Sequence, residues 1–586
     1  MYQPSSMMSA KALGRMTPQE DPRENGTSAI GDVPRFVQFT SPVSTGRVKD
    51  GFGLALPLNI VALIVQWLDD TGDLARVCRT CRLLYYMTSP LLYRRVTLHS
   101  YPDIRYVNGR PEGFGGGSPF VMALNGLVTM THAELVEEFK LWGGWREHGQ
   151  DDFAKGRVPD NSMMLNILLR AATDKMVKLR SFCWQLDCKP LKTLYLGLSA
   201  HTTLTSLTIR FPTSRVPRPS VMIPPMANLR AFKAMDIDPL CYPDDISMLL
   251  LHSRKLEDLR LHWSSRMRRE AEPSLSLDTY FGRCIRAGYS MKVKHIGLQN
   301  FFGNNMRGME EILDRDACRS MCALDMFGGV GSRMSTARNV YIDDSWRQIP
   351  PEMRCAFRQM RTNEVAPQHV ELIRRNEVPL ENMYFVSHKY CEGKADSTAS
   401  PITPEYAPMG SEEEMTRLGK DYLSVLTGPN SKSLKHLLLR DEWALTEEEI
   451  SNLVRSCPNL EQLGMALGTK SLAIIPLLIP FLSKLRAFRI LHNEHVAENM
   501  RVMSHEQRME MMSKDMWKGG MKDLQYIGIG DAVYKVGKIY QVTMEDGSLE
   551  WRTEVTLGSQ AEVQNMEIWG LDNLDISAEP VAKFAP

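Results

Sequence analysis

A short apolar pattern recurs at steps of about 25 residues, and no other feature restricts the fold of this chain as strongly. The segments KLRSFCW, TLTSLTI, NLRAFKA and KLEDLRL have their first leucines at Leu179, Leu204, Leu229 and Leu256, which gives steps of 25, 25 and 27 residues. Three of the four carry large apolar residues three and five positions later; in NLRAFKA the last of these is only Ala234. Such regular spacing predicts a structural repeat.

The same pattern returns in the C-terminal half. SLKHLLL, NLEQLGM, KLRAFRI and DLQYIGI begin at Leu434, Leu460, Leu485 and Leu524, and KVKHIGL at Val293 and LENMYFV at Leu380 also fit. A pattern L-x-x-L-x-L with a period of roughly 20 to 29 residues is typical of leucine-rich repeats. Between two copies, Thr446 and Glu449 predict a helical capping box. A helical apolar stripe follows it, and Pro458 ends the helix, so one unit is helix, turn and short strand.

We therefore predict an α/β fold. Residues 176–575 are expected to form a leucine-rich-repeat solenoid, with parallel strands on its concave face and helices on its convex face. Residues 392–419 read as a disordered insertion into this array, and residues 301–375 fit the period poorly. Residues 1–50, rich in Ser, Pro, Gly and charge, are expected to be a disordered tail. Residues 99–175 are expected to hold connecting helices, one of them around THAELVEEFKLW, and a Gly-rich loop.

Composition and charge exclude several classes of partner. Seventy basic and sixty-nine acidic residues give a net charge of +1, which provides no overall attraction for nucleic acid or anionic lipid. No apolar run reaches the roughly 18 to 20 residues that a membrane helix needs. Eleven scattered cysteines and the lack of a secretory signal favour a reducing compartment, the cytoplasm and/or the nucleus. A mitochondrial presequence stays an alternative, since the first acidic residue is Glu20.

The chain shows none of the searched signatures of catalysis or metal binding. Cys78 and Cys81 form a C-x-x-C pair without a second pair, and core packing is the favoured interpretation. GFGGGS and GGVGS are not followed by the Gly-Lys-Ser/Thr of a phosphate loop. Neither G-x-S-x-G nor H-E-x-x-H occurs. We expect a binding protein rather than an enzyme, with no cofactor and no metal.

The segment from Leu56 to Arg95 predicts three short helices. Pro57 suits the first turn of a helix, which is apolar on nearly every side and runs to about Leu68. Asp73 is placed to cap the next helix, whose apolar face includes Leu74. Because about forty residues make a small core, this module is expected to gain stability by docking on a partner.

Residues 54–98 resemble an F-box, in the form common in fungal F-box/leucine-rich-repeat proteins. The matching residues are Leu56-Pro57, Ile60, Ile64, Leu68, Asp73-Leu74, Cys81-Arg82, Leu84-Tyr85 and Pro90-Leu91-Leu92-Tyr93. The resemblance implies that this segment docks on the Skp-type linker of a cullin-RING ubiquitin ligase while the repeats hold a protein substrate. By analogy, the linker-facing residues are Leu56, Pro57, Ile60, Ile64, Leu68 and Leu74.

Two positions depart from that family pattern and keep an alternative open. The family often has an acidic residue where this chain has Asn59, and a valine where it has Thr80. The alternative is a repeat-containing scaffold that works outside any ligase. The C-terminal stretch also resembles such proteins, in which a last repeat strand runs into a β-hairpin, with EDG as its turn.

Alternate positions of the predicted strands define a candidate substrate face. Leucines point to the core of a solenoid, and the residues between them point to the concave surface. Taken singly, each such residue is better explained by a solvated surface. As a group they are polar and basic, which favours an acidic or phosphorylated partner. The candidate residues are Arg210, Arg260, His262, His295, His436, Arg440 and Arg489.

Overall fold

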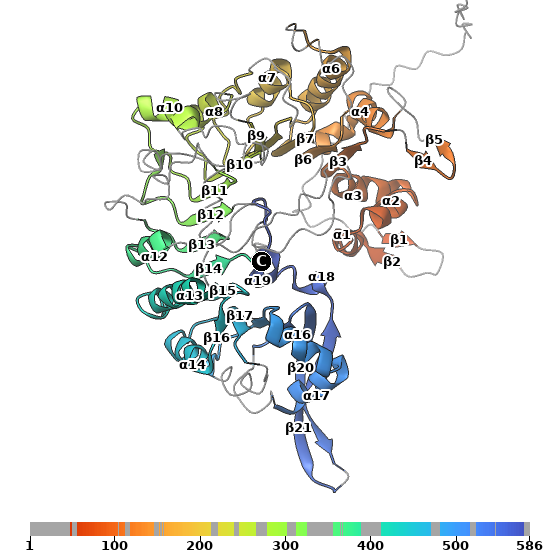
Figure 1. Ribbon diagram of the computed structural model, residues 1–586. Helices are drawn as coiled ribbons and strands as arrows, with labels where there is room; N and C mark the ends of the chain where they lie inside the picture. Colours follow the sequence, from red (N-terminus) through yellow and green to blue (C-terminus); the bar gives the residue numbers. More distant parts are fainter. Residues whose placement is uncertain are drawn as a thin grey trace, which may run out of the picture. The chain divides into compact units, whose positions relative to one another are not determined.

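The computed structural model divides the chain into two compact units, Met1–Met87 and Thr88–Pro586, called here the N-terminal and C-terminal units (Figure 1). No helix in the described part of the chain is long and apolar enough to span a bilayer. The structure describes residues 47–49, 55–103, 105–111, 118–145, 152, 155, 157–212, 221–238, 245–264, 278–301, 312–324, 355–363, 365, 367–387, 412–469, 481–515, 523–544 and 546–578.

The N-terminal unit is mainly helical. Helices α1 (Leu58–Gln66) and α2 (Thr71–Cys78) are followed by α3 (Arg82–Leu92), which continues into the C-terminal unit. Asp70, rather than the predicted Asp73, caps α2: its Oδ1 accepts the Asp73 N–H at 2.8 Å. Strands β1 (Arg47–Lys49) and β2 (Ala55–Pro57) pair antiparallel, so the end of the predicted disordered tail forms a strand.

The C-terminal unit is built on one long series of strand pairings. From β3 to β19 the neighbouring strands are parallel, and the last two pairings, β19–β20 and β20–β21, are antiparallel. The short β16 pairs only with β17, and β4 pairs with β5 in a separate ribbon. The strands are β3 (Arg95–Ser100), β4 (Tyr106–Val107), β5 (Arg110–Pro111), β6 (Glu138–Gly143), β7 (Ser181–Leu186), β8 (Ser206–Arg210), β9 (Ala231–Ile237), β10 (Asp258–Trp263), β11 (His295–Gln299), β12 (Ser320–Leu324), β13 (Gln359–Thr362), β14 (Asn382–Phe385), β15 (His436–Leu438), β16 (Ala444–Leu445), β17 (Gln462–Leu467), β18 (Ala487–Ile490), β19 (Tyr526–Ile529), β20 (Ala532–Thr543) and β21 (Leu549–Gly558).

Helices lie between most of these parallel strands, as crossover connections require (Figure 1). The predicted capping box is confirmed: the Thr446 hydroxyl accepts the Glu449 N–H at 3.3 Å, and the Glu449 carboxylate accepts the Thr446 N–H at 2.9 Å. The helices are α4 (Pro119–Thr129), the 3₁₀ helix η2 (Thr131–Leu135), α6 (Asp160–Lys175), α7 (Lys192–Ala200), α8 (Ser247–His252), α10 (Asp278–Arg286), α12 (Pro367–Arg374), α13 (Glu412–Thr427), α14 (Glu447–Ser456), α16 (Glu494–Val502), α17 (His505–Asp515), α18 (Gln560–Val563) and α19 (Glu567–Gly570).

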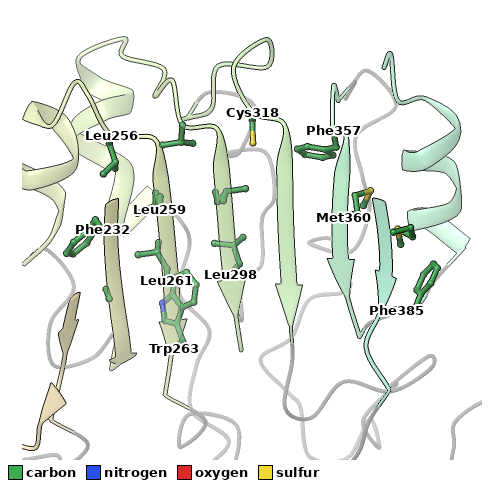
Figure 2. Close-up of a cluster of buried hydrophobic side chains, with 14 of the residues drawn as sticks. Phe232, Leu256, Leu259, Leu261, Trp263, Leu298, Cys318, Phe357, Met360 and Phe385 are labelled. Carbon is green, nitrogen blue, oxygen red and sulfur yellow. The ribbon is translucent and has the colours of Figure 1, made fainter. Parts of the chain in front are cut away.

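A buried apolar residue, here called the opener, lies two positions before each of the strands from β6 to β19 except β16. Each opener is at most 5% exposed. Figure 2 shows the openers Leu256, Cys318 and Phe357 at the same end of their strands, with Leu259, Leu261 and Leu298 further along. The openers are Val136, Leu179, Leu204, Leu229, Leu256, Val293, Cys318, Phe357, Leu380, Leu434, Leu460, Leu485 and Leu524.

One backbone hydrogen bond recurs directly after each opener. The residue that follows the opener, here called the ladder residue, donates its N–H to the carbonyl of the ladder residue before it, over 2.7 to 2.9 Å. Several ladder side chains also form ion pairs: Glu257 pairs with Arg230 at 3.6 Å and with Lys294 at 3.2 Å. The ladder residues are Glu137, Arg180, Thr205, Arg230, Glu257, Lys294, Arg319, Arg358, Glu381, Lys435, Glu461, Arg486 and Gln525, and the first of them, Glu137, donates to the carbonyl of Arg94.

The main core lies between one face of the sheet and the helices. It includes Phe182 and Trp184 of β7 and Leu207 and Ile209 of β8, together with Leu194 of α7. Side chains at alternate positions of these strands point away from this core and are half-buried, as the predicted alternation requires. The opposite face of the sheet is called the polar face below.

The predicted boundaries need four corrections. The sheet begins at β3 and not near residue 176, because β3 and β6 pair with each other and β6 pairs with β7. The predicted helix around THAELVEEFKLW is η2 followed by β6, whose burial alternates strictly along EFKLW. The poorly fitting stretch 301–375 contains β12 and β13. Helix α13 begins at Glu412, inside the predicted insertion 392–419, whose first part lies outside the described residues.

The predicted C-terminal hairpin is present. Strands β20 and β21 pair antiparallel, and Gly547 in the connection has a φ of 80°, a conformation that glycine adopts without strain. Next to it, the Asp546 Oδ1 accepts the Ser548 N–H at 2.9 Å.

An opener supports the turns on both sides of it, so its truncation is expected to destabilise the unit strongly. Leu460→Ala should lower the free energy of unfolding by about 2–5 kcal/mol, since it removes a fully buried side chain and leaves a cavity. Urea titration followed by circular dichroism measures the change. Leu549→Ala, at a position that is 62% exposed, is the control and should change it by less than about 0.5 kcal/mol. Equal effects of the two substitutions would contradict this account of the core.

Candidate protein-binding surfaces

An apolar stripe on α1 is exposed to solvent. Ile60, Leu63, Ile64 and Trp67 follow one another at helical spacing and are 38%, 51%, 52% and 84% exposed, respectively. On the opposite side of the helix, Val65 is buried. Four large apolar side chains exposed along one helix are typical of a surface that another protein covers. These four residues are called the exposed stripe below.

The predicted linker-facing residues differ in their exposure. Ile60 and Ile64 belong to the exposed stripe, Pro57 is exposed at the N-cap of α1, and Leu68 is half-buried. Leu74 is only 5% exposed, so it contributes to the interior and does not present a surface to a partner, contrary to the prediction. Leu56 lies on β2 opposite Val48, and its side chain lies outside what the structure describes.

Sequence reasoning missed several exposed apolar residues of this unit. Leu63 and Trp67 complete the stripe, and Tyr86 on α3 is 52% exposed. The i, i+3, i+4, i+7 spacing of the stripe was visible in the sequence, but a helix that is apolar on all sides gives no sign of which side is covered. Cys81 is exposed and Cys78 half-buried, so core packing does not explain both members of the C-x-x-C pair.

The C-terminal segment of the chain covers much of the polar face. Residues 559–578, called the C-terminal strap, contain α18 and α19. Backbone carbonyls of the strap accept hydrogen bonds from side chains of the sheet. Arg361 on β13 donates to the carbonyls of Leu571, Asn573 and Asp575 over 2.9, 2.5 and 3.0 Å. Bonds from a cationic donor are roughly twice as strong as neutral ones. The Arg361 guanidinium alone therefore makes three of the contacts that hold the strap on the middle of the sheet.

A second apolar core lies beneath the strap. Ile568, Trp569 and Leu571 of the strap pack in one buried cluster with Tyr384 and Leu438 of the sheet. Gly528 on β19 allows this close approach, because a Cβ at that position would lie 2.7 Å from the Trp569 ring. A side chain in place of this glycine would therefore force the strap to move.

The strap also occupies several residues of the predicted substrate face. Arg260 donates to the Ile576 carbonyl at 2.8 Å and pairs with Asp258 at 2.9 Å. Arg489, 7% exposed at its side chain, donates to the Ile568 carbonyl at 2.7 Å and pairs with Asp572 at 2.8 Å. The prediction that Arg489 is open to a substrate is wrong in this structure, since the chain itself buries it.

Arg440 is also buried. Its side chain is 1% exposed and donates to the Asn363 carbonyl at 2.7 Å and to the Glu442 carboxylate at 2.8 Å. It follows β15 instead of lying on it, because that strand ends at Leu438. The alternation rule placed Arg440 on the polar face by extending the strand two residues too far.

Arg210 and His262 form a small polar network with Asp236. The Arg210 Nε lies 2.5 Å from one oxygen of Asp236, and the His262 Nδ1 lies 3.4 Å from the other. The His262 Nε2 lies 3.2 Å from the Asn300 amide nitrogen. Burial lowers the pKa of His262, although the Asp236 charge opposes this effect. Contacts at both ring nitrogens hold His262 in this network.

His295 and His436 lie on the same row of the polar face but differ in environment. His295 on β11 is exposed. His436 on β15 is half-buried, and its Nδ1 lies 2.8 Å from the Tyr384 hydroxyl. Burial lowers the pKa of His436 and raises the pKa of Tyr384. Among the described residues, no group of three or more His, Cys, Asp or Glu is placed to hold a metal ion.

Comparison with known proteins identifies the first helical segment. Residues 54–99 match the family model described as F-box-like. This chain carries an F-box-like domain. The exposed stripe lies within the F-box-like domain, which extends into β3. No curated protein matches the chain.

Among solved structures, a chain from the crystal structure of the Rad7 and Elc1 complex in yeast is similar at 13% sequence identity. The similarity covers 58% of the present chain and 85% of that chain, with a TM-score of 0.29.

Substitution of Gly528 tests how the strap is held. Gly528→Ala should loosen the strap, because its methyl group would meet Trp569 and the Arg489 side chain. Faster amide hydrogen exchange is expected in residues 563–576, with a loss of roughly 1–3 kcal/mol of stability. Gly282→Ala on α10 is the control, since nothing lies within 4 Å of its added Cβ. Unchanged exchange in the strap of Gly528→Ala would contradict the packing described above.

Proposed function

We propose that this protein is a substrate-recognition subunit of an SCF-type E3 ubiquitin ligase. The F-box-like domain docks on a Skp-type linker and through it on a cullin-RING ligase, and the C-terminal unit binds a target protein. The exposed stripe of α1 carries the proposal, because it lies within the matched segment and presents a continuous apolar surface.

We further propose that the sheet from β6 to β19 is a leucine-rich-repeat solenoid. Buried openers and crossover helices recur along one series of parallel strands, which is how stacked repeats bury a common core. Several openers are not leucine, namely Val136, Val293, Cys318 and Phe357. All four are apolar, so each can occupy the buried position that leucine has in the other openers.

In this proposal the protein acts by proximity and not by bond chemistry of its own. Holding the target beside a ubiquitin-loaded enzyme raises the effective concentration of the reacting groups. The adaptor therefore needs two binding surfaces and no active site, cofactor or metal. The proposal places the protein in the cytoplasm and/or the nucleus. It includes no nucleic-acid or membrane partner.

A second candidate is a scaffold whose F-box-like domain no longer engages a linker. It is favoured by Asn59 and Thr80, which are both exposed and both depart from the family pattern, and by the burial of Leu74. Such a protein would keep the sheet as a binding surface and would work outside any ligase. Linker capture separates the two candidates.

Charge placed on the exposed stripe is expected to abolish linker binding. The double substitution Ile64→Asp with Trp67→Asp buries two carboxylates in an apolar interface, which should weaken capture by about 100-fold or more. The measurement is a pull-down titration with purified Skp-type linker. Both side chains are more than half exposed, so the fold should be retained, and a melting curve checks this.

The matched control is Leu549→Asp, which changes an exposed apolar residue of β21 outside the F-box-like domain. It should capture the linker as the unaltered chain does. If the folded, unaltered chain captures no linker, the ligase proposal fails and the scaffold takes its place. Linker capture by the double variant at full strength would show that docking does not use α1.

A further inference from the structure

The edge of the sheet at which the strands begin carries an uneven charge. From β7 to β13 the first residues of successive strands are register partners, so the openers lie at one end of the sheet (Figure 2), with a residue on either side of each. These flanking positions hold eight cations and one anion, Glu257, which gives a net charge of +7. The eight cations, called here the basic edge, are Lys178, Arg180, Arg230, Lys255, Lys292, Lys294, Arg319 and Arg358.

The rest of the chain does not share this excess. From β14 to β19 the positions that flank the openers hold three cations and three anions, so this half of the edge is balanced. The whole chain has a net charge of +1, and the residues elsewhere in it therefore carry −6. Positive charge is thus concentrated on seven successive turns.

Most of the basic edge is open to solvent. Seven of its eight residues are exposed, and Arg319 is half-buried. Among the described residues, no carboxylate pairs with Lys178, Arg180 or Lys292. Lys255 donates to the neutral amide oxygen of Asn228 at 2.7 Å and keeps its charge unopposed.

The carboxylates that reach the basic edge are each shared by two cations. Glu257 lies 3.6 Å from Arg230 and 3.2 Å from Lys294, so this group of three keeps a net charge of +1. Arg358, at the far end, pairs at 2.9 Å with Glu381, which also pairs with a lysine of the balanced half. One carboxylate between two cations leaves attraction for a further anion.

The residues around the basic edge do not cancel its charge. One position further from the strands, Arg254 and Asp316 are the charged residues of these seven turns, and they offset each other. On the turn before the basic edge, Glu137 is engaged by Arg94 at 3.3 Å. The field of the exposed lysines and arginines is therefore directed to solvent.

The form of the basic edge favours an acidic polypeptide over a nucleic acid. Neighbouring strands lie about 4.8 Å apart, so the seven turns span about 29 Å, the length of roughly nine residues of extended chain. No flanking position of these turns holds an aromatic residue, so bases would find no stacking surface. Glu257 would repel a continuous phosphate backbone, whereas a polypeptide can place a neutral or basic side chain beside it.

We propose that the basic edge binds an acidic segment of the target protein, with its carboxylates on Lys178, Arg180 and Lys292. Charge-assisted bonds between carboxylates and these side chains supply the attraction. Binding takes place where the strands begin and not on the polar face, much of which the strap covers. This inference rests on the proposed function and names the chemistry of the target.

Binding of a fluorescein-labelled decaglutamate peptide to the full-length chain tests the proposal by fluorescence anisotropy. We expect saturable binding that weakens as salt rises, and no binding of a labelled Gly-Ser peptide of the same length. Lys178→Glu with Arg180→Glu should weaken binding by about tenfold or more, because it reverses two charges of the basic edge that have no carboxylate partner.

The chain contains a matched control for this variant. Lys484 and Arg486 flank an opener in the same tripeptide, Lys-Leu-Arg, but lie in the balanced half of the edge, and both are exposed. Lys484→Glu with Arg486→Glu makes the same change in net charge and should leave binding unchanged. Equal loss of binding in the two variants would overturn the proposal. Tighter binding of a labelled DNA duplex, weakened by the first variant alone, would also overturn it.

Acetylation of lysines provides a second readout, which does not depend on substitutions. Bound decaglutamate should slow the reaction of Lys178 and Lys292 with an N-hydroxysuccinimide ester of acetate, measured by mass spectrometry. Lys484 should react at an unchanged rate and is the internal standard. Unchanged acetylation of Lys178 and Lys292 at saturating peptide would contradict the proposed site.

Linker capture is measured on the same preparation. A chain that captures the linker but not decaglutamate overturns this inference and leaves the ligase role intact. A chain that binds decaglutamate at the basic edge but captures no linker supports the surface and overturns the ligase role.

Discussion

One backbone hydrogen bond, repeated from strand to strand, sets the arrangement on which the rest of the C-terminal unit depends. The ladder residue of each turn donates to the carbonyl of the ladder residue before it, so successive strands start at the same level. Side chains alternate along a strand. Strands that start at the same level therefore place their openers, and the apolar residues at alternate positions after them, in one core. The same register collects the polar residues into rows on the other face.

The strap shows that a polar row is not necessarily a free surface. Arg361 and Arg489 lie at strand positions that alternation assigns to the outside, yet both are buried beneath the strap. Removing a guanidinium from water is costly unless acceptors replace the lost solvent. The strap carbonyls supply those acceptors, and Trp569 and Leu571 fill the space between them with apolar contact. The C-terminal half of the polar face is therefore a second interior of the protein.

The sequence predicted those features of the fold that depend on a single local pattern. The leucine period placed the openers from Leu179 to Leu256 and from Leu434 to Leu524, and the capping box at Thr446 followed from two residues. The leucine period did not predict the openers Cys318 and Phe357, because residues other than leucine occupy these buried positions. Burial of Arg489 was not foreseeable, because it depends on the strap, a segment that is distant in sequence. In the F-box-like domain, residue type identified the module, but only the fold shows which side of α1 is exposed.

From Arg358 to Arg486 the charges of the ladder alternate, and this has a consequence for how these turns find their order. Glu381 lies between Arg358 and Lys435, at 2.9 and 2.7 Å, and Glu461 follows next to Lys435 in the row. A chain that skipped the Lys435 turn during folding would bring Glu381 against Glu461 and lose the attraction between Glu381 and Lys435. Each such pair is weak at the surface, but within this stretch skipping any one of the three inner turns brings two like charges together. The ladder charges thus favour the correct order of turns that all have leucine as their opener.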